Sequence, residues 1–502
     1  MAGLALRLSG LSDRLASGPV DEIVRLAGAL VMGALGWRRA PDPHEGLHGT
    51  ARFAEPGERT AGLARPEGLI IGQTRQGRLL RHDGPGHLLT LAPTRSGKGV
   101  GAVIPNLLMA DRAVICIDPK GENAKVCAGA RLRFGPVHVL DPFGASGLPS
   151  QAYDPLVALD PGDPDLSDRA FALAEALVHD AEGQAGEAHW NEEARALIAG
   201  VILHVVTTPQ QRSAGLLQVR DHLTCSPEAF RALLKTMQAS PAAGGLVARA
   251  ANRHLAKSDR EAAGVLSSAQ RHTHFLDSPR LSRVLGRCDF SLQDLPQNRA
   301  SLFIVLPPDR LATHSRWMRL LLVQALGELA ASGPPPATSP GVLFLLDEFA
   351  ALGRLEPVER AYGLMAGYGV QLWAILQDLH QLRALYGPSS GTFLSNAGVI
   401  QVFNVAELDT ATWVSRTLGA STELQTSTTQ AAPGLSQLLR GAGRTITRAP
   451  IRRELLTPDE VMRLSPDRLI LLRPGHRPVL AWKVRYFAQA IFRDRITAYT
   501  AP

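Results

Sequence analysis

The stretch from His87 to Gly101 limits what this chain can fold into more than any other part of its sequence. It begins as an apolar run, continues as a glycine-rich loop and ends in small residues suited to the first turn of a helix. Backbone N–H groups of such a loop, and of the helix N-terminus after it, converge on an anion. We therefore expect a strand, a phosphate-binding loop and a helix here, with Lys98 reaching the terminal phosphates of a nucleotide.

The loop departs from the usual phosphate-binding pattern at two positions. Ala92 stands where the first glycine would be, and Gly99 stands where a serine or threonine would bind Mg²⁺. Thr94 and Ser96 are the alternative sources of that hydroxyl, and a plain glycine-rich turn with an exposed lysine is the structural alternative for the whole motif. The residues expected to contact a nucleotide are Thr94, Arg95, Ser96, Gly97, Lys98, Gly99 and Val100.

A second apolar run, residues 342–346, ends in two carboxylates, Asp347 and Glu348. A run of this length suits a strand buried on both faces of a parallel sheet, and acids at its carboxyl end lie where α/β folds place ligands. We expect Asp347 to hold Mg²⁺ and Glu348 to polarise the attacking water. Acids at a helix N-terminus are the alternative for this pair alone, but the pair occurs together with Lys98.

Further apolar runs predict the remaining strands of a doubly wound parallel sheet, because each is followed by a helical pattern or by a turn rich in Pro or Gly. The expected strands, after a hairpin at 69–80, are 113–118, 137–141, 300–306, 370–376 and 398–403, with closing strands at 469–472 and 479–484. Gln377 follows one of them, where a glutamine can sense a γ-phosphate or orient water. A hydrogen-bonded core amide is the equal alternative for Gln377.

The amino-acid composition and the spacing of apolar residues change between residues 156 and 287. β-branched runs disappear, and Ala, Leu and Glu dominate at helical spacing. We expect an all-α domain at 156–287, inserted into a nucleotide-binding domain at 49–155 and 288–502 that follows a helical lead-in at 1–48.

The net charge of +7 and the pI of about 9.5 favour a polyanionic partner, with a basic but inert surface as the alternative. The polar, threonine-rich segment Thr422 to Arg448 is expected to be a basic surface loop. Arg452 and Arg453 are expected to begin a last helix-containing segment.

Cysteine usage and the N-terminus bear on where the chain works. The four cysteines show no C-x-x-C pairing and no metal-ligand spacing, so we interpret them as reduced thiols of a cytosolic protein. The most apolar N-terminal piece, Leu26 to Trp37, is too short and too glycine-rich for a bilayer span, which needs about 20 residues. An ordinary amphipathic helix is favoured there over an interfacial one.

Four motifs and two shorter matches carry a resemblance to a known family: Pro93 to Gly99, Asp118 to Glu122, Leu346 to Phe349 with Leu352-Gly353, Gln377 with Gln381-Leu382, Tyr153 to Leu156, and Ser395-Asn396. Together they resemble the type IV secretion coupling proteins, the TraG-type conjugative DNA-transfer ATPases. The resemblance runs from about Gly49 to about Leu472, and the combination is specific although each piece alone is not.

The resemblance implies a RecA-like P-loop NTPase fold with an inserted all-α domain, ATP and Mg²⁺ as cofactors, and Lys98, Asp347 and Glu348 as the nucleotide site. The resemblance also implies that a glycine at position 99 is typical of this branch of the family. Relatives generally form hexamers around a channel and link a relaxase–DNA complex to a secretion pore at the inner membrane. The implied location is the cytoplasm, peripheral at the inner face of the cell membrane, and the implied nucleic acid is single-stranded DNA.

Two departures from the family are visible in the sequence. No N-terminal membrane anchor of the kind many relatives carry is evident, and residues 363–369 lack the arginine that some relatives direct at a neighbouring subunit's phosphate. Arg354, Arg360 and Arg416 are alternatives for that arginine. The rival functions are a motor that pumps double-stranded DNA and a non-hydrolysing docking receptor for secreted protein effectors.

Overall fold

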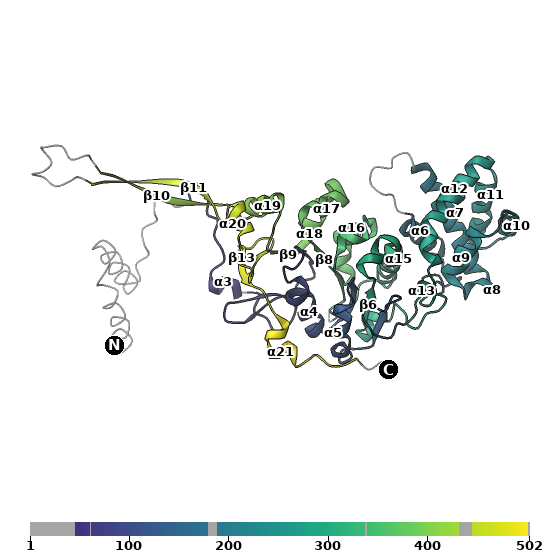
Figure 1. Cartoon of the computed structure of the whole chain (residues 1–502), viewed down its shortest axis with the longest axis horizontal. Helices are drawn as coiled ribbons and strands as arrows, with labels where there is room; N and C mark the ends of the chain where they lie inside the picture. The colour runs from purple at the N-terminus through teal and green to yellow at the C-terminus, as the bar shows by residue number, and fades with distance from the viewer. Residues whose placement is uncertain (1–45, 61, 179–187, 337–338, 431–443, 500–502) are drawn as a thin grey trace, which may run out of the picture. The chain divides into compact units, whose positions relative to one another are not determined.

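The computed structural model describes residues 46–60, 62–178, 188–336, 339–430 and 444–499 (Figure 1). The predicted helical lead-in at 1–48 lies outside these residues, apart from 46–48. The chain divides into two compact units. One contains the residues up to Ala51 together with Gly419–Leu455, and the other contains Arg52–Leu418 and Leu456–Pro502.

An 11-stranded sheet forms the centre of the larger unit and confirms the predicted α/β fold, in the order β2-β1-β13-β12-β9-β3-β8-β7-β4-β6-β5. The strands from β9 to β5 run parallel, whereas β12, β13, β1 and β2 extend the sheet antiparallel. Their bounds are β1 Leu69–Gln73, β2 Leu79–His82, β3 His87–Leu91, β4 Ala113–Asp118, β5 Val137–Leu140, β6 Ser301–Val305, β7 Val342–Leu346, β8 Val370–Leu376, β9 Ala397–Phe403, β12 Arg468–Leu472 and β13 Val479–Trp482.

Helices cover both faces of the parallel part of the sheet, with α4 and α5 on one side and α15 to α18 on the other (Figure 1). Every residue of β3, β4, β6, β7 and β8 is therefore buried, which explains why these strands are continuous apolar runs. The helices of this unit outside residues 156–287 are α3 Pro56–Thr60, α4 Ile104–Met109, α5 Glu122–Arg131, α14 Leu295–Asn298, α15 Pro308–Ala331, α16 Glu356–Leu364, α17 Leu379–Tyr386, α18 Ser390–Asn396, α19 Leu408–Leu418, α20 Pro458–Met462 and α21 Ala490–Arg493.

A chain of buried hydrogen bonds crosses the middle of the sheet. Trp373 Nε1 on β8 donates to Thr90 Oγ1 on β3 at 2.8 Å, and that hydroxyl donates to Gln401 Oε1 on β9 at 2.7 Å. Gln401 Nε2 in turn donates to the carbonyl of Ile71 on β1 at 2.8 Å. Because a buried polar group without a partner is costly, this chain fixes the register of the strand that leads into the glycine-rich loop.

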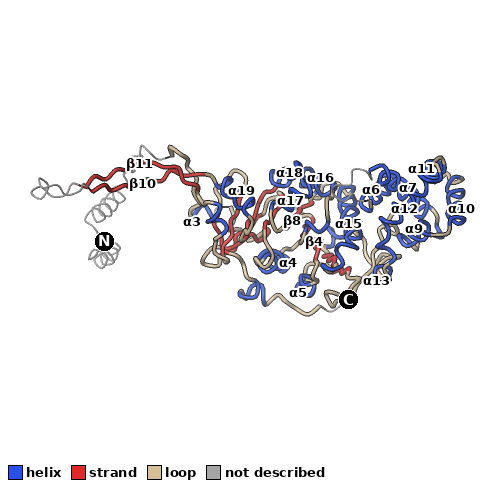
Figure 2. Tube along the Cα trace, turned by 45° about the horizontal axis from the view of Figure 1, so that its top comes forward, coloured by secondary structure: helices blue, strands red, loops and turns tan. Residues whose placement is uncertain are grey.

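Between β5 and β6 the described residues from 156 onward form helices and loops only. Up to residue 287 the α-helices are α6 Leu166–Leu177, α7 Ala188–Thr207, α8 Pro209–Arg212, α9 Gly215–Thr224, α10 Pro227–Gln238, α11 Leu246–Leu255, α12 Asp259–Thr273 and α13 Pro279–Ser282, and α14 follows just before β6. The long helix α7 packs against α6, α9, α11 and α12 and is buried over most of its length, as its apolar sequence requires (Figure 2). No helix in the described parts of the chain has the length and hydropathy to cross a membrane.

The chain enters and leaves this helical segment at one place, around Asp154. Backbone hydrogen bonds join the two crossings: Tyr153 N to Val284 O, Asp154 N to Arg287 O and Asp289 N to Ala152 O, at 2.9–3.1 Å. The fully buried carboxylate of Asp154 accepts backbone N–H groups from three separate stretches, at Leu156, Leu216 and Gly286. Burial raises the pKa of this carboxyl, although these N–H groups oppose the rise.

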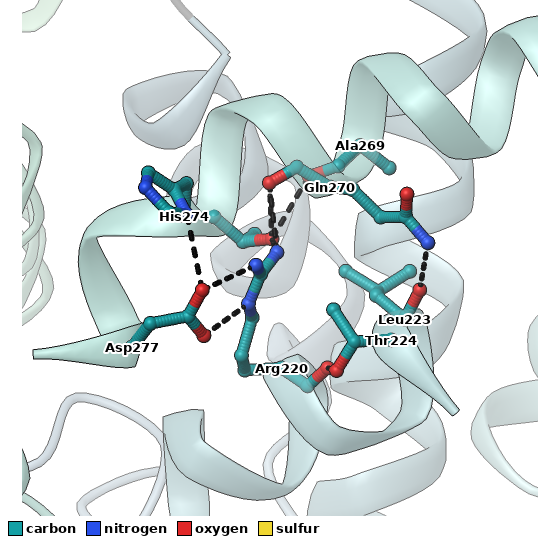
Figure 3. Close-up of polar contacts among 8 residues, drawn as sticks. Arg220, Leu223, Thr224, Ala269, Gln270, His274 and Asp277 are labelled. Carbon is teal, nitrogen blue, oxygen red and sulfur yellow. Dashed lines mark hydrogen bonds and ion pairs between the residues drawn. The ribbon is translucent and has the colours of Figure 1, made fainter. Parts of the chain in front are cut away.

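A buried arginine connects α9 to the end of α12 (Figure 3). Arg220 donates to both carboxylate oxygens of Asp277 at 2.7 and 2.6 Å, to the carbonyl of Gln270 at 2.8 Å and to the hydroxyl of Thr273 at 3.1 Å. His274 also contacts Asp277, at 3.0 Å. The hydrogen bond from Arg220 is the main cause that lowers the pKa of Asp277.

Replacing this arginine, Arg220→Met, is expected to lower the free energy of unfolding by about 2 kcal/mol, because hydrogen bonds to a charged group are lost. A lowered pKa in the folded state means that the stabilisation is fully present above the unfolded pKa of about 4 and is lost as the pH falls from there through the lower folded pKa. Scanning calorimetry at pH 7 and at pH 3 should therefore show a difference in unfolding temperature between wild type and variant that is smaller at pH 3. The exposed Arg231 on α10 provides the matched control, Arg231→Met, and an equal difference at both pH values would contradict the expectation.

In the smaller unit, the prediction of a surface loop from Thr422 to Arg448 is wrong. Strands β10 (Ala420–Gln430) and β11 (Arg444–Glu454) pair antiparallel along their whole length, and residues 431–443 lie outside the described part. Arg452 and Arg453 therefore belong to β11 and do not begin a helical segment. Threonine favours extended backbone, and a hairpin without a buried face needs no apolar alternation, so the sequence pattern was misleading here.

Candidate active site

The glycine-rich loop follows β3 and turns tightly into a helix. Ala92 N still bonds to Leu376 O of β8 at 2.8 Å, after which the backbone adopts positive φ at Arg95 (64°) and Gly97 (90°). The first helical turn, η1 (Gly99–Val103), has π-helical hydrogen bonding and continues into α4. This is the strand–loop–helix geometry expected of a phosphate-binding loop, with the loop N–H groups and the helix start on one side.

Four of the predicted residues meet beside this loop. Lys98 Nζ lies 2.5 Å from Glu348 Oε1 and 3.2 Å from Asp347 Oδ1. Gln377 Nε2 donates to Glu348 Oε2 at 3.5 Å. Because β3, β8 and β7 are neighbouring parallel strands, residues just beyond their carboxyl ends come together although they are far apart in sequence.

The backbone at Glu348 is strained. This residue has φ 51° and ψ 45°, a left-handed backbone conformation that residues other than glycine rarely adopt. The turn is supported by Asp347 Oδ1, which accepts the N–H of Glu348 at 3.0 Å. Such strain costs about 1–3 kcal/mol and persists where a side chain must be aimed, and here it aims Glu348 at Lys98.

At this edge of the sheet, burial disfavours the ionised form of two carboxyl groups. Burial raises the pKa of Asp347, against the opposing effect of the Lys98 ammonium. Burial raises the pKa of Asp118, at the end of the neighbouring strand β4, to about 7, and the Asp347 carboxylate adds to that rise. A cation close to these acids would relieve both penalties. The sequence motif pointed to Asp118 but assigned it no role in the site.

The two hydroxyls left open by the sequence lie in different surroundings. Thr94 is exposed at the loop, whereas Ser96 Oγ is buried and has no hydrogen-bond partner among the described residues. A side chain at position 99 would meet nothing within 4 Å, so Gly99 is not required by crowding. Hard oxygen donors such as the Asp347 carboxylate and the Thr94 hydroxyl are what Mg²⁺ prefers.

The remaining loop residues predicted to contact a nucleotide line the same turn. Arg95 is exposed, and Ser96, Gly97, Gly99 and Val100 are partly buried. Of the arginines weighed for action on a neighbouring subunit, Arg354 lies within 3.7 Å of Glu356 and 3.5 Å of Glu359, while Arg360 and Arg416 are exposed.

Sequence reasoning missed a second lysine at the loop. Lys483, just after β13, donates to the carbonyl of Ser96 at 2.6 Å and to Asn404 Oδ1 at 2.5 Å. Its ammonium also lies 4.8 Å from the ring centre of Phe403. Burial lowers the pKa of Lys483 to about 8. No local motif signals this contact, because the residues are brought together only by the antiparallel extension of the sheet.

Comparison with known sequences identifies relatives along most of the chain. The family described as "Type IV secretory system Conjugative DNA transfer" matches residues 57–502. A conjugal transfer protein TraG of Escherichia coli is 29% identical over 506 residues, covering 91% of this chain and 79% of that protein. Protein VirD4 of Agrobacterium fabrum is 29% identical over 465 residues, covering 89% of this chain and 67% of that protein.

Solved structures share the fold. The bacterial conjugative coupling protein TrwBdeltaN70 in its unbound form aligns with a TM-score of 0.64 and 16% identity, over 86% of this chain and 92% of that one. The plasmid coupling protein TrwB in complex with ADP and Mg²⁺ gives a TM-score of 0.63 and 16% identity, over 87% and 94%. At such identities the likeness concerns the fold alone, and it agrees with the mostly parallel sheet and its covering helices.

Proposed function

Because this chain belongs to the type IV secretory system conjugative DNA transfer family, we propose that it is an ATP-hydrolysing coupling protein of such a system. In this role it recruits DNA carried by a relaxase and drives it into the secretion channel. The observation that carries the proposal is the meeting of Lys98 with Asp347, Glu348 and Gln377 at the carboxyl ends of three adjacent strands.

Each side chain has a task in the proposed hydrolysis. Lys98 and the loop N–H groups bind the terminal phosphates and offset their charge. Asp347, with the hydroxyl of Thr94 or Ser96, would hold Mg²⁺, which when bound with ATP neutralises charge that develops on the phosphate oxygens. Glu348 accepts a proton from the attacking water, and Gln377 orients that water from beside it.

We further propose a homo-hexamer around a channel that holds single-stranded DNA. The net charge of +7 supports a polyanionic partner, and contacts to phosphates would be independent of base sequence. Arg360 and Arg416 are the candidates for an arginine that reaches a neighbour's nucleotide. We assign the helical segment 156–287 to a separate inserted domain that meets the substrate, and we place the protein in the cytoplasm at the inner face of the membrane.

The proposal is tested by steady-state ATP hydrolysis of the purified full chain without DNA, with single-stranded DNA and with double-stranded DNA. We expect turnover that rises several-fold with single-stranded DNA and falls back as salt is raised, because phosphate contacts release counterions. A preference for the duplex would instead indicate a double-stranded DNA motor.

The substitutions at Ala92 and Gly99 keep a non-hydrolysing docking receptor as the second candidate. It is favoured if ATP binds but no condition yields turnover. Binding can be followed separately with a fluorescent ATP analogue, so that a hydrolysis defect is not confused with a failure to bind.

A further inference from the structure

A cavity of about 700 Å³ lies at the amino ends of the parallel strands. Arg112 in its wall directly precedes β4, and Val370 begins β8. The glycine-rich loop follows the carboxyl end of β3, which is parallel to β8. The cavity and the nucleotide site therefore lie at opposite edges of the same sheet, and the proposed hydrolysis makes no use of the cavity.

Two arginines in the cavity wall are almost completely buried. Arg81 on β2 is 8% exposed and Arg112 is 9% exposed. Neither guanidinium has a carboxylate within ion-pair distance among the described residues. A buried charge without a counter-charge is costly, so two of them in one cavity are not explained by packing alone.

Most N–H groups of these two arginines are left unused by the protein. A guanidinium has five N–H donors. Arg81 donates one N–H to the carbonyl of Gly68 at 3.1 Å. Arg112 donates to Gln371 Oε1 at 2.6 Å and, at the longer distance of 3.4 Å, to the carbonyl of Gly341. Gln371 donates its own amide to the carbonyls of Gly84 and Gly86 at 2.9 and 2.8 Å, which holds Arg112 in place.

The acids of the cavity wall do not neutralise this charge. Asp111 accepts a forked contact from Arg299 at 2.9 Å, and Asp83 pairs with Arg65 at 2.5 Å, both at exposed positions. Glu67 is exposed as well. These acids are therefore exposed and are paired with other arginines or surrounded by solvent, whereas Arg81 and Arg112 are buried and have no acidic partner in the described part of the chain.

Burial lowers the pKa of Arg112 to about 10 and also lowers that of Arg81. A bound anion would relieve this desolvation penalty. Guanidinium forks match the oxygens of a phosphate, and a cavity of about 300–1,000 Å³ is typical of small-molecule sites.

We propose that this cavity is a second anion site, which binds the phosphate group of a small phosphorylated molecule or of a lipid headgroup through Arg81 and Arg112. Its ligand is distinct from the nucleotide at the glycine-rich loop. The shared chemistry is a phosphate group that accepts the unused N–H groups of Arg81 on β2 and of Arg112 before β4, both of which line the cavity.

The test uses the full chain carrying Lys98→Met, which weakens anion binding at the glycine-rich loop. Inorganic pyrophosphate is titrated into this protein and binding is followed by calorimetry. We expect saturable binding that Arg81→Gln and Arg112→Gln each weaken at least tenfold. Arg299→Gln, which removes the arginine already paired at the rim, should leave the affinity within about threefold. If Arg112→Gln does not fold because Gln371 loses its partner, Arg81→Gln decides alone.

A second arm separates the two sources of phosphate. Vesicles of phosphatidylglycerol, compared with vesicles of phosphatidylcholine, are sedimented with the same proteins. Sedimentation with the anionic vesicles that pyrophosphate competes away and that Arg81→Gln abolishes assigns the site to a lipid headgroup, whereas pyrophosphate binding alone assigns it to a soluble ligand. Absence of saturable binding of either probe, or binding that Arg81→Gln leaves unchanged, overturns the proposal.

Discussion

Glu348→Gln is expected to reduce ATP turnover by about 10²–10⁴-fold, the usual contribution of a general base. An amide cannot accept the proton of the attacking water, but it has nearly the same shape as the carboxylate it replaces. Lys98 keeps its contact with Asp347 at 3.2 Å, so nucleotide binding should change little. The measurement is DNA-stimulated hydrolysis at saturating ATP, beside the affinity for a fluorescent ATP analogue.

The matched control is Glu356→Gln, a nearby exposed acid at the start of α16. This variant should hydrolyse ATP at close to the wild-type rate. Lys98→Met completes the set, because it should lose binding as well as turnover. Turnover by Glu348→Gln within about threefold of wild type would show that another group activates the water.

Asp154→Ala should have the largest effect on stability, lowering the free energy of unfolding by about 3–5 kcal/mol. The carboxylate is fully buried and accepts backbone N–H groups at Leu156, Leu216 and Gly286. An alanine leaves these donors without a partner, and each unsatisfied buried group costs about 1–3 kcal/mol. Denaturant unfolding of the full chain measures the loss.

Asp160→Ala is the control for this prediction, since Asp160 is exposed and its carboxylate bonds only to the N–H of Gly162 among the described residues. A double-mutant cycle sharpens the test. Gly215 has φ 55°, and a Cβ there would lie 2.2 Å from Asp154 Oδ2. Gly215→Ala should therefore destabilise wild type more than it destabilises Asp154→Ala. Additive effects, or a loss below about 1 kcal/mol in Asp154→Ala, would contradict this account.

What the sequence predicted depended on local pattern. The strand, loop and helix around Lys98 and the acids after β7 are each encoded within a few neighbouring residues, and the rule that parallel strands share a carboxyl edge brings them together. Lys483 could not be found in this way. Its contact with Ser96 spans most of the chain and depends on how β13 pairs at the antiparallel end of the sheet.

The hairpin of β10 and β11 was not predicted because its local sequence lacks the pattern of a strand. Most of its residues are polar, so hydrophobic periodicity, the main signal for a strand, is missing. Asp154 illustrates a third case. The motif Tyr153 to Leu156 was visible in the sequence, but only the structure shows that its carboxylate also binds two distant backbone segments, at Leu216 and Gly286.

The closed junction around Asp154 also has an evolutionary consequence. Because both crossings into the helical segment meet at one point and β5 is the edge strand of its sheet, the segment can lengthen, shrink or be exchanged between relatives without disturbing a strand pair. Mutations can then accumulate in the helical segment while the sheet is inherited unchanged. Chimaeras between relatives should be joined at this junction.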